Sequence, residues 1–363
     1  MPVDFDSILF LSFGGPDKPD DVRPFLENVT RGRGVPPERL DEVAQHYLHF
    51  GGVSPINELN LAMIDSIRAE LSSRAIDLPV FFGNRNWHPM VEDTIARMHD
   101  AGHRRVLVFP TSAWGGYSGC AQYHEDIGRA LASLGERAAD MVLRKLPQYW
   151  HHALFGEAAG DAVRRAAASL SGDFEPRLVF TAHSIPDAAD RNSGPPGDEW
   201  TRTGLPASDD GGRLYSSQVL AASQRAATAA GFSDFDQVWQ SRSGPPQIPW
   251  LEPDIVDHLE VIAAQGIRSV IVSPIGFVSD HLEVVWDLDN EAREKAAELG
   301  LEYVRADTVG TDRRFISMAV DLIEQYRSGE LPAGVPLGVA DNGMYCVGGT
   351  CCRAAVRRPH AVG

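Results

Sequence analysis

Short runs of β-branched and aliphatic residues alternate with longer stretches of helical periodicity along the whole chain. Runs of this kind predict buried strands, and the stretches between them predict the helices that connect parallel strands. The expected strands are Ile8–Leu11, Val80–Phe82, Val106–Phe109, Leu178–Phe180, Val238–Gln240, Val270–Val272 and Leu301–Val304. The pattern therefore predicts an α/β fold with mostly parallel sheets that carry helices on both faces.

Two segments show the boundary signals of helices. Residues 89–102, "PMVEDTIARMHDAG", and residues 253–266, "PDIVDHLEVIAAQG", both start at proline, carry acidic residues in the first turn and stop at glycine. Proline and acidic side chains suit the amino end of a helix, and glycine suits its carboxyl end. A last helix is expected at Arg313–Arg327. Residues 191–213, rich in glycine, proline and aspartate, are expected to form an exposed loop.

The two halves of the chain repeat the same pattern. "ILFLSFGGP" at 8–16 corresponds to "LVFTAHSIP" at 178–186, and "AGHRRVLVFPTS" at 101–112 corresponds to "QGIRSVIVSPIG" at 265–276. Self-similarity over so long a period predicts one supersecondary unit used twice.

We therefore expect two doubly wound, Rossmann-like halves that face each other across a cleft, each with a parallel four-stranded sheet. Ligands of such sheets bind beyond the carboxyl ends of the strands. The expected parts are an N-terminal half at 1–165, a C-terminal half at 166–330 and a cysteine-containing tail at 331–363.

Charge and composition exclude several classes of partner. The chain carries 50 acidic and 33 basic residues, a net charge of −17. Nucleic acid and anionic membranes need a concentrated basic surface, so neither is expected as a main partner. The chain has no secretory signal pattern, no apolar run long enough for a transmembrane segment, and no glycine-rich phosphate loop after the first strand. The sequence thus predicts a cytoplasmic enzyme whose chemistry does not depend on a nucleotide.

Candidate chemistry gathers near the predicted carboxyl ends of strands. His183, in "FTAHSIP", directly follows a buried strand, and Glu283, Asp287 and Glu291 fall at i, i+4 and i+8 on a helix expected to start near Asp280. A histidine at a strand end is often structural, and acidic helix faces are often only solvated, so both interpretations stay open from the residues alone. Together, a histidine and a row of hard oxygen ligands suit a site where a divalent cation and exchangeable protons meet.

At these motifs the chain resembles the ferrochelatases, which insert ferrous iron into a porphyrin. The resemblance rests on "LSFGGP", "FLENVTRGRG", "HYLHFGGVSPIN", "FGNRNWHP", "TAHSIP", "QSRSGPPQIPWLEP" and "GFVSDHLEVVWDLD", which follow the family's order over nearly the whole chain. It is closest to actinobacterial members that use coproporphyrin III. The resemblance implies a lyase of heme biosynthesis with a porphyrin cleft between its halves, and ferrous iron and coproporphyrin III as substrates.

The resemblance also implies roles for the candidate residues. His183 would take pyrrole protons or hold iron on one face of the macrocycle, and Glu283 would act from the opposite face. Asp287 and Glu291 match the acid row that the family links with metal access. The expected catalytic pair is therefore His183 and Glu283, and the expected metal ligands are His183, Glu283, Asp287 and Glu291.

The resemblance also implies which residues contact the substrate. Arg31, Tyr47, Ser54 and Tyr123 match positions used for propionate contact, and Phe13, His88 and Trp250 are expected to line the macrocycle. Ordinary core packing would explain the aromatic residues equally well. Phe13 stands where firmicute members have a tyrosine that reaches the iron, and His46 stands where many coproporphyrin enzymes have arginine. Because phenylalanine cannot ligate a metal, the axial ligand of the product must come from elsewhere.

Three of the four cysteines lie close together in the tail. They are Cys346, Cys351 and Cys352, and the fourth is Cys120. A structural disulfide is not expected in a reducing cytosol, and four thiolates could bind either zinc or an iron–sulfur cluster. Several ferrochelatases carry a 2Fe–2S cluster, so the resemblance implies such a cluster on the four cysteines, or on three of them with another fourth ligand.

Several alternatives stay open. The substrate could be protoporphyrin IX, because the choice of coproporphyrin III rests on resemblance alone. A non-catalytic tetrapyrrole or metal carrier would share the cleft but would not need both His183 and the acid row. A chelatase for cobalt or nickel would share the fold, although such enzymes tend to be shorter and richer in histidine near the site. A monomer is expected.

Overall fold

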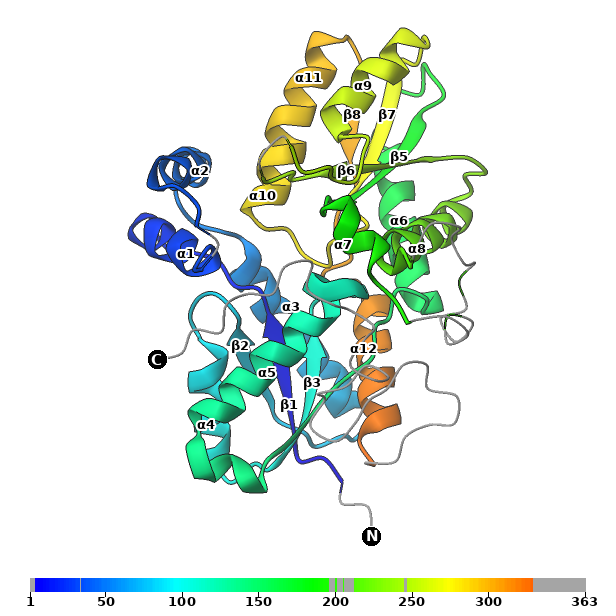
Figure 1. Cartoon of the computed structure of the whole chain (residues 1–363). Coiled ribbons are helices and arrows are strands. Elements are labelled where there is room, and N and C mark those ends of the chain that lie inside the picture. Colours follow the sequence, from blue (N-terminus) through cyan, green and yellow to red (C-terminus); the bar gives the residue numbers. More distant parts are fainter. Residues whose placement is uncertain are drawn as a thin grey trace.

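The structure, a computed structural model, consists of two four-stranded sheets flanked by helices (Figure 1). It describes residues 4–32, 34–195, 200, 205, 212–244 and 247–328. The strands are β1 (Ser7–Ser12), β2 (Val80–Asn84), β3 (Arg105–Pro110), β4 (Val142–Lys145), β5 (Arg177–His183), β6 (Asp236–Gln240), β7 (Ser269–Ser273) and β8 (Glu302–Arg305). The sheets have the orders β2-β1-β3-β4 and β6-β5-β7-β8, and their neighbouring strands pair in parallel. The predicted repeat of one unit is confirmed by this identical order.

The strand β4 was missed by the sequence pattern, whereas the seven expected strands are all present. Its sequence, "VLRK", ends in two charged residues, which the alternation of apolar runs does not identify as a buried strand. In the structure Arg144 and Lys145 are buried nevertheless. The Nζ of Lys145 donates to the carbonyl oxygen of Leu146 (3.3 Å), so pairing with β3 and local hydrogen bonds override the local preference.

Helices connect the strands, as parallel pairing requires. They are α1 (Val22–Val29), α2 (Pro37–His49), α3 (Ile56–Ser73), α4 (Val91–Asp100), α5 (Gln122–Ser133), α6 (Ala153–Ala167), α7 (Asp187–Arg191), α8 (Leu214–Ala230), α9 (Ile255–Ala264), α10 (Leu282–Val284), α11 (Arg293–Glu298) and α12 (Arg313–Tyr326). The two segments with helix boundary signals form α4 and α9, and the expected last helix is α12. Two further segments are π-helical, η2 (Tyr117–Ala121) and η5 (Val285–Ala292).

Successive residues of β1 belong to different cores, because successive side chains of a strand point to opposite faces of the sheet. Leu9 and Leu11 pack with residues of α4 and α5. Ile8 and Phe10 belong to a larger cluster that also contains Phe180 of β5 and residues of α6, α8 and α12. One continuous core therefore joins the two halves and fixes the position of one sheet relative to the other.

The last helix returns to the first half (Figure 1). There α12 packs against α3 and α6, and Arg74 at the end of α3 donates to the carbonyl oxygen of Ser317 (3.3 Å) and to Oδ1 of Asp321 (2.5 Å). The predicted boundary between the halves falls inside α6, which packs along α8. The division at 1–165 and 166–330 stays a prediction.

The loop expected at 191–213 is described only in part. Trp200 and Leu205 are buried and belong to the core cluster that joins the halves, so the expectation of an exposed loop is wrong at these two positions. Across the described residues, no helix combines the length and the apolar character needed to cross a membrane.

Candidate active site

His183 is the last residue of β5 and lies at the carboxyl edge of the second sheet, where ligands of doubly wound sheets bind. Its Nε2 is 3.7 Å from Oε2 of Glu283 in α10. Its Nδ1 is 2.5 Å from the carbonyl oxygen of Ser184. The side chains of His183 and Glu283 are 37% and 43% exposed, so a ligand can reach both. The structure thus brings together the two residues at which the sequence predicted proton chemistry. The expected placement of Glu283 on the opposite face of the macrocycle is wrong, because a ring does not fit between two side chains 3.7 Å apart.

Glu283 is positioned by the start of α10. The Nδ1 of His281 accepts hydrogen bonds from the backbone N–H groups of Glu283 (3.2 Å) and Val284 (3.4 Å), which have no partner within the helix. Burial lowers the pKa of His281, so its ring is neutral and can accept. Asp280 accepts two hydrogen bonds of 3.0 Å from Arg305. This ion pair holds the turn before α10 in place and occupies both oxygens of the Asp280 carboxylate.

The acid row continues into η5, whose π-helical form the sequence did not predict. Periodicity predicted an ordinary α-helix here, because a π-helical insertion leaves no clear mark on a short apolar pattern. Segments of this kind are rare and are frequently found at functional sites. The row nevertheless gathers its charges on one side, since Glu283 and Glu291 both act electrostatically on Asp287.

Asp287, the middle acid of the row, is held by two side-chain hydrogen bonds. It accepts hydrogen bonds from Nε2 of Gln240 (3.1 Å), the last residue of β6, and from the hydroxyl of Ser241, which follows β6. Burial, with a contribution from the neighbouring carboxylates Glu283 and Glu291, raises the pKa of Asp287 to about 7. Glu291 is exposed and Glu283 is 43% exposed, so the acid that burial affects most, Asp287, lies between two accessible carboxylates.

The raised pKa predicts how stability depends on pH. Below about pH 4, Asp287 is protonated in both the folded and the unfolded protein. Between about pH 4 and 7 only the unfolded chain releases the proton, so folding becomes less favourable as pH rises. Asp287→Asn removes this penalty; at pH 8 we expect the metal-free variant to be more stable than the wild type by about 2–4 kcal/mol. Urea unfolding of both proteins from pH 4 to 8 measures this, and a difference that does not grow with pH would contradict it.

The four expected metal ligands do not form one closed coordination site. Over the described ranges, no group of three or more His, Cys, Asp or Glu side chains could hold a metal ion. The close pair is His183 and Glu283, while Asp287 is engaged by Gln240 and Ser241. Metal ligation by these residues therefore stays a prediction.

The first half contributes Tyr47, near the end of α2, to the same site. Burial raises the pKa of Tyr47 well above its ordinary value, and Glu283 and Asp287 raise it further. The phenol therefore lies within electrostatic reach of the acid row and stays neutral. Phe13 packs in the cluster that contains Tyr47 and Leu282 of α10. This expected wall residue thus lies where the two halves meet.

A further contact between the halves was not predicted. The ring of His46 stacks on Trp286 of η5 with a centroid distance of 3.8 Å and an interplanar angle of 4°. His49 and Phe50 approach the same indole edge-on. Burial lowers the pKa of His46, so a neutral ring covers the indole. No local sequence signal identifies a pair so far apart in the chain.

Tyr123 lies near the carboxyl ends of β2 and β3. Its hydroxyl is 3.4 Å from Oγ1 of Thr111, and the guanidinium carbon of Arg85 lies 4.3 Å from its ring centroid. Burial raises the pKa of Tyr123, so this phenol is neutral. Arg85, which the sequence analysis missed, is itself held by a buried ion pair with Asp126.

The remaining expected contacts are spread around the site. Ser54 is buried against Gly15 in the loop after β1, where an added Cβ would lie 2.6 Å from the Cβ of Ser54. Trp250 is half-buried, and its backbone forms an isolated β-bridge with Pro186, just beyond His183. Arg31, past the end of α1, and His88 are exposed. Their roles towards a porphyrin stay predictions.

Of the predicted cluster ligands, the structure describes Cys120 alone. Its side chain is buried, with 3% exposure, in η2. Cys346, Cys351 and Cys352 lie outside the described residues. The predicted four-cysteine set is therefore not tested by the structure.

Comparison with known proteins gives a consistent result. The family model described as ferrochelatase matches residues 6–327. A protein named coproporphyrin III ferrochelatase from Nocardia farcinica is 58% identical, over 99% of this chain and 99% of its own length. A protein of the same name from Mycobacteroides abscessus is 61% identical over 90% and 89% of the two chains.

Solved structures agree at the level of the fold. SirB from Bacillus subtilis with Fe³⁺ superposes with a TM-score of 0.51 at 11% sequence identity, over 89% of this chain and 96% of that chain. A structure of the sirohydrochlorin chelatase SirB from Bacillus subtilis subspecies spizizenii in complex with cobalt gives the same TM-score at 10% identity. The two-sheet architecture is therefore shared beyond the range of close sequence similarity.

Proposed function

The chain belongs to the ferrochelatase family, and on this premise we propose that it inserts ferrous iron into coproporphyrin III to give coproheme in heme biosynthesis. The observation that carries this proposal is the accessible pair of His183 and Glu283, 3.7 Å apart at the carboxyl edge of the second sheet. The names of the relatives at 58% and 61% identity support the choice of porphyrin.

Metal insertion replaces two pyrrole N–H bonds with bonds to iron, so two protons must leave the macrocycle. The Nε2 of His183 is the side-chain base that faces the site and can accept them. The carboxylate of Glu283 stabilises the protonated imidazole across 3.7 Å and offers the next acceptor on the way to solvent. Ferrous iron and the porphyrin are both substrates in this scheme.

The acid row supplies the route for iron. We propose that the exposed Glu291 meets the hydrated cation first and that Asp287 and Glu283 bind it further in. Carboxylate oxygens are suitable ligands for a divalent cation such as ferrous iron. Because the pKa of Asp287 is about 7, it can exchange its proton for the cation near neutral pH.

Porphyrin recognition falls to residues from both halves. We propose that Arg31, Ser54 and the neutral phenols of Tyr47 and Tyr123 bind the propionates, and that Phe13, His88 and Trp250 contact the ring. Coproporphyrin carries four carboxylates, so an acidic protein must place such donors where the propionates emerge. Phe13 offers no oxygen to iron, so the fifth ligand of the product comes from another residue or from water.

The proposal is tested by anaerobic insertion of ferrous iron into coproporphyrin III and protoporphyrin IX in parallel, followed by absorbance. We expect rapid turnover of coproporphyrin III and little or none of protoporphyrin IX. Turnover of protoporphyrin IX alone would keep the reaction and change the substrate. Tight binding of both without turnover would favour the carrier instead.

We also propose that Cys120 binds a 2Fe–2S cluster together with Cys346, Cys351 and Cys352. Cysteine thiolates are the usual ligands of such clusters, and the buried position of Cys120 suits a shielded ligand. Protein purified without oxygen should show visible charge-transfer absorption and acid-labile sulfide, both lost in Cys120→Ser. Absence of both signals in the wild type would refute the cluster. A cytoplasmic location and a monomeric state stay predictions.

A further inference from the structure

We infer that Ser184 and Tyr215 are positioning residues for His183. They hold the backbone around this histidine so that its Nδ1 keeps the proton and its Nε2 presents a lone pair to the site. The catalytic consequence of this inference rests on the proposed function, because a base that accepts pyrrole protons must have that lone pair free. The tautomer of His183 can be measured without any enzymatic turnover.

The tautomer follows from the hydrogen bond at Nδ1. This nitrogen lies 2.5 Å from the carbonyl oxygen of Ser184. A carbonyl oxygen can only accept, so Nδ1 must be the donor and must carry the proton. In the neutral ring Nε2 is then unprotonated, and it is Nε2 that faces Glu283 at 3.7 Å. The contact with Ser184 therefore selects the form of the ring that can act as a base.

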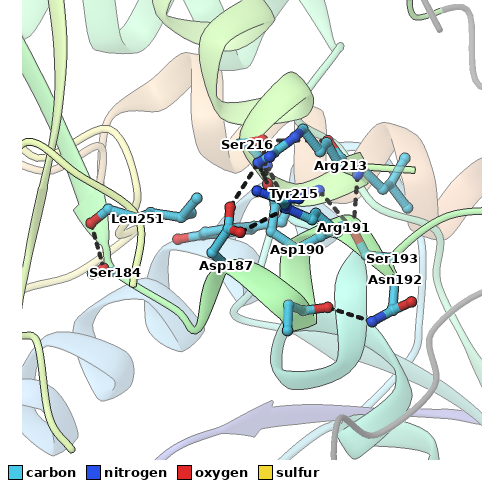
Figure 2. A network of polar contacts seen from close by, with 12 residues as sticks. Ser184, Asp187, Asp190, Arg191, Asn192, Ser193, Arg213, Tyr215, Ser216 and Leu251 are labelled. Carbon is cyan, nitrogen blue, oxygen red and sulfur yellow. Dashed lines mark hydrogen bonds and ion pairs between the residues drawn. The ribbon is translucent and has the colours of Figure 1, made fainter. Parts of the chain in front are cut away.

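Ser184 can select the tautomer because its own position is fixed twice. Its backbone N–H donates to the carbonyl oxygen of Gln240 in β6 (2.7 Å), and its hydroxyl donates to the carbonyl oxygen of Leu251 (2.8 Å). The residue is almost fully buried, so water does not compete for these bonds. Figure 2 shows the bond from Ser184 to Leu251. The carbonyl group of Ser184 cannot turn away from His183 without straining these two bonds.

Tyr215 holds the preceding peptide unit, the one between His183 and Ser184. Its phenol donates to the carbonyl oxygen of His183 (2.9 Å), and burial raises the pKa of Tyr215, so the donor stays protonated. The ring contacts Trp239, with a centroid distance of 5.8 Å, and Trp114 from the first half, at 6.4 Å. These two aromatic contacts restrict movement of the phenol.

The start of α8, which carries Tyr215, is held by a buried network (Figure 2). Asp190 accepts from the backbone N–H of Ser216 (3.1 Å) and from its hydroxyl (2.6 Å), and the hydroxyl of Ser193 accepts from the N–H of Leu214 (2.8 Å). Asp190 is fully buried. These side chains satisfy the N–H groups that the first turn of a helix leaves unpaired. The network thus fixes the start of α8 and with it the position of Tyr215.

The structural part is tested by ¹⁵N NMR of metal-free protein with ¹⁵N-labelled histidine, at a pH where the rings are neutral. The spectrum of His183→Gln assigns the His183 signals. We expect a protonated Nδ1 and an unprotonated Nε2 in the wild type. Ser184→Ala and Tyr215→Phe should shift His183 towards a mixture of tautomers. A wild-type ring protonated at Nε2 would overturn the inference, whatever the activity.

Matched variants separate positioning from a general loss of stability. Tyr149→Phe removes a buried phenol that donates to the carbonyl oxygen of Pro110 (3.2 Å), and Ser223→Ala removes a buried hydroxyl that donates to Gln237 (2.7 Å). Both controls should leave the His183 signals and kcat unchanged. Ser184→Ala and Tyr215→Phe should lower kcat by about two- to tenfold, the worth of one hydrogen bond, with KM for the porphyrin unchanged. Equal effects in all four variants, or unchanged tautomers in the two test variants, would refute the positioning role.

Discussion

His183→Ala should lower the rate of iron insertion by about 10²–10⁴-fold while the porphyrin still binds. In the proposed mechanism His183 supplies the Nε2 that accepts pyrrole protons, whereas the expected porphyrin contacts come from other residues of both halves. Anaerobic initial rates with coproporphyrin III measure the first effect. Titration of the porphyrin with protein, followed by fluorescence, measures the second.

His258→Ala is the matched control for this prediction. His258 lies in the same half and also faces an acid, with Nε2 2.9 Å from Oδ2 of Asp236. Asp236 is the first residue of β6, so it lies at the amino ends of the strands, opposite the carboxyl ends where His183 lies. Loss of this ring should leave insertion close to the wild-type rate. Wild-type turnover by His183→Ala, or an equal loss in both variants, would contradict the assigned role.

Glu283→Gln should lower kcat for insertion by about a hundredfold. Glutamine keeps the size and the polar contacts of the side chain but removes the negative charge that stands 3.7 Å from Nε2 of His183. In the proposed mechanism the variant lacks a charged proton acceptor beside His183 and one carboxylate for iron. KM for iron should therefore rise as kcat falls, while affinity for the porphyrin is unchanged. Steady-state rates at varied iron and varied porphyrin separate these parameters.

Glu302→Gln provides the comparison at a distance from the site. Glu302 starts β8 and accepts a hydrogen bond from the backbone N–H of Ser171 (2.6 Å). The variant loses a carboxylate charge of the same kind, so any general effect of net charge on iron attraction should appear in it too. If Glu302→Gln reduced turnover as much as Glu283→Gln, the local role of Glu283 would be wrong.

Local pattern was sufficient to predict the fold class because each strand core is an apolar run and each half repeats the other. It failed where tertiary pairing overrides composition, as at β4, whose charged residues Arg144 and Lys145 are buried. It also failed at η5, where the buried positions Leu288 and Ala292 are too few for periodicity to distinguish a π-helix from an α-helix. The packing of α12 back onto α3 could not be predicted either, since no local signal specifies which core a helix covers.

The candidate site was predictable as far as motifs mark it. His183 and Glu283 were expected at one site but on opposite faces of the macrocycle, whereas the structure brings them within 3.7 Å of each other. The residues that hold them were not predicted: His281, which caps α10, and Tyr215, which binds the carbonyl oxygen of His183. Such supports act through backbone hydrogen bonds between distant segments, and a single sequence carries no pattern for these. The stacked pair of His46 and Trp286 was missed for the same reason.

We propose that one porphyrin binds between the two halves with its pyrrole nitrogens facing His183. The most direct measurement is a crystal structure of the protein with metal-free coproporphyrin III. We predict a macrocycle between the Tyr47 side of the first half and the edge that carries His183 and Glu283, with Nε2 of His183 within hydrogen-bond reach of a pyrrole nitrogen. A porphyrin bound elsewhere, or one whose nitrogens face away from both His183 and Glu283, would contradict the account.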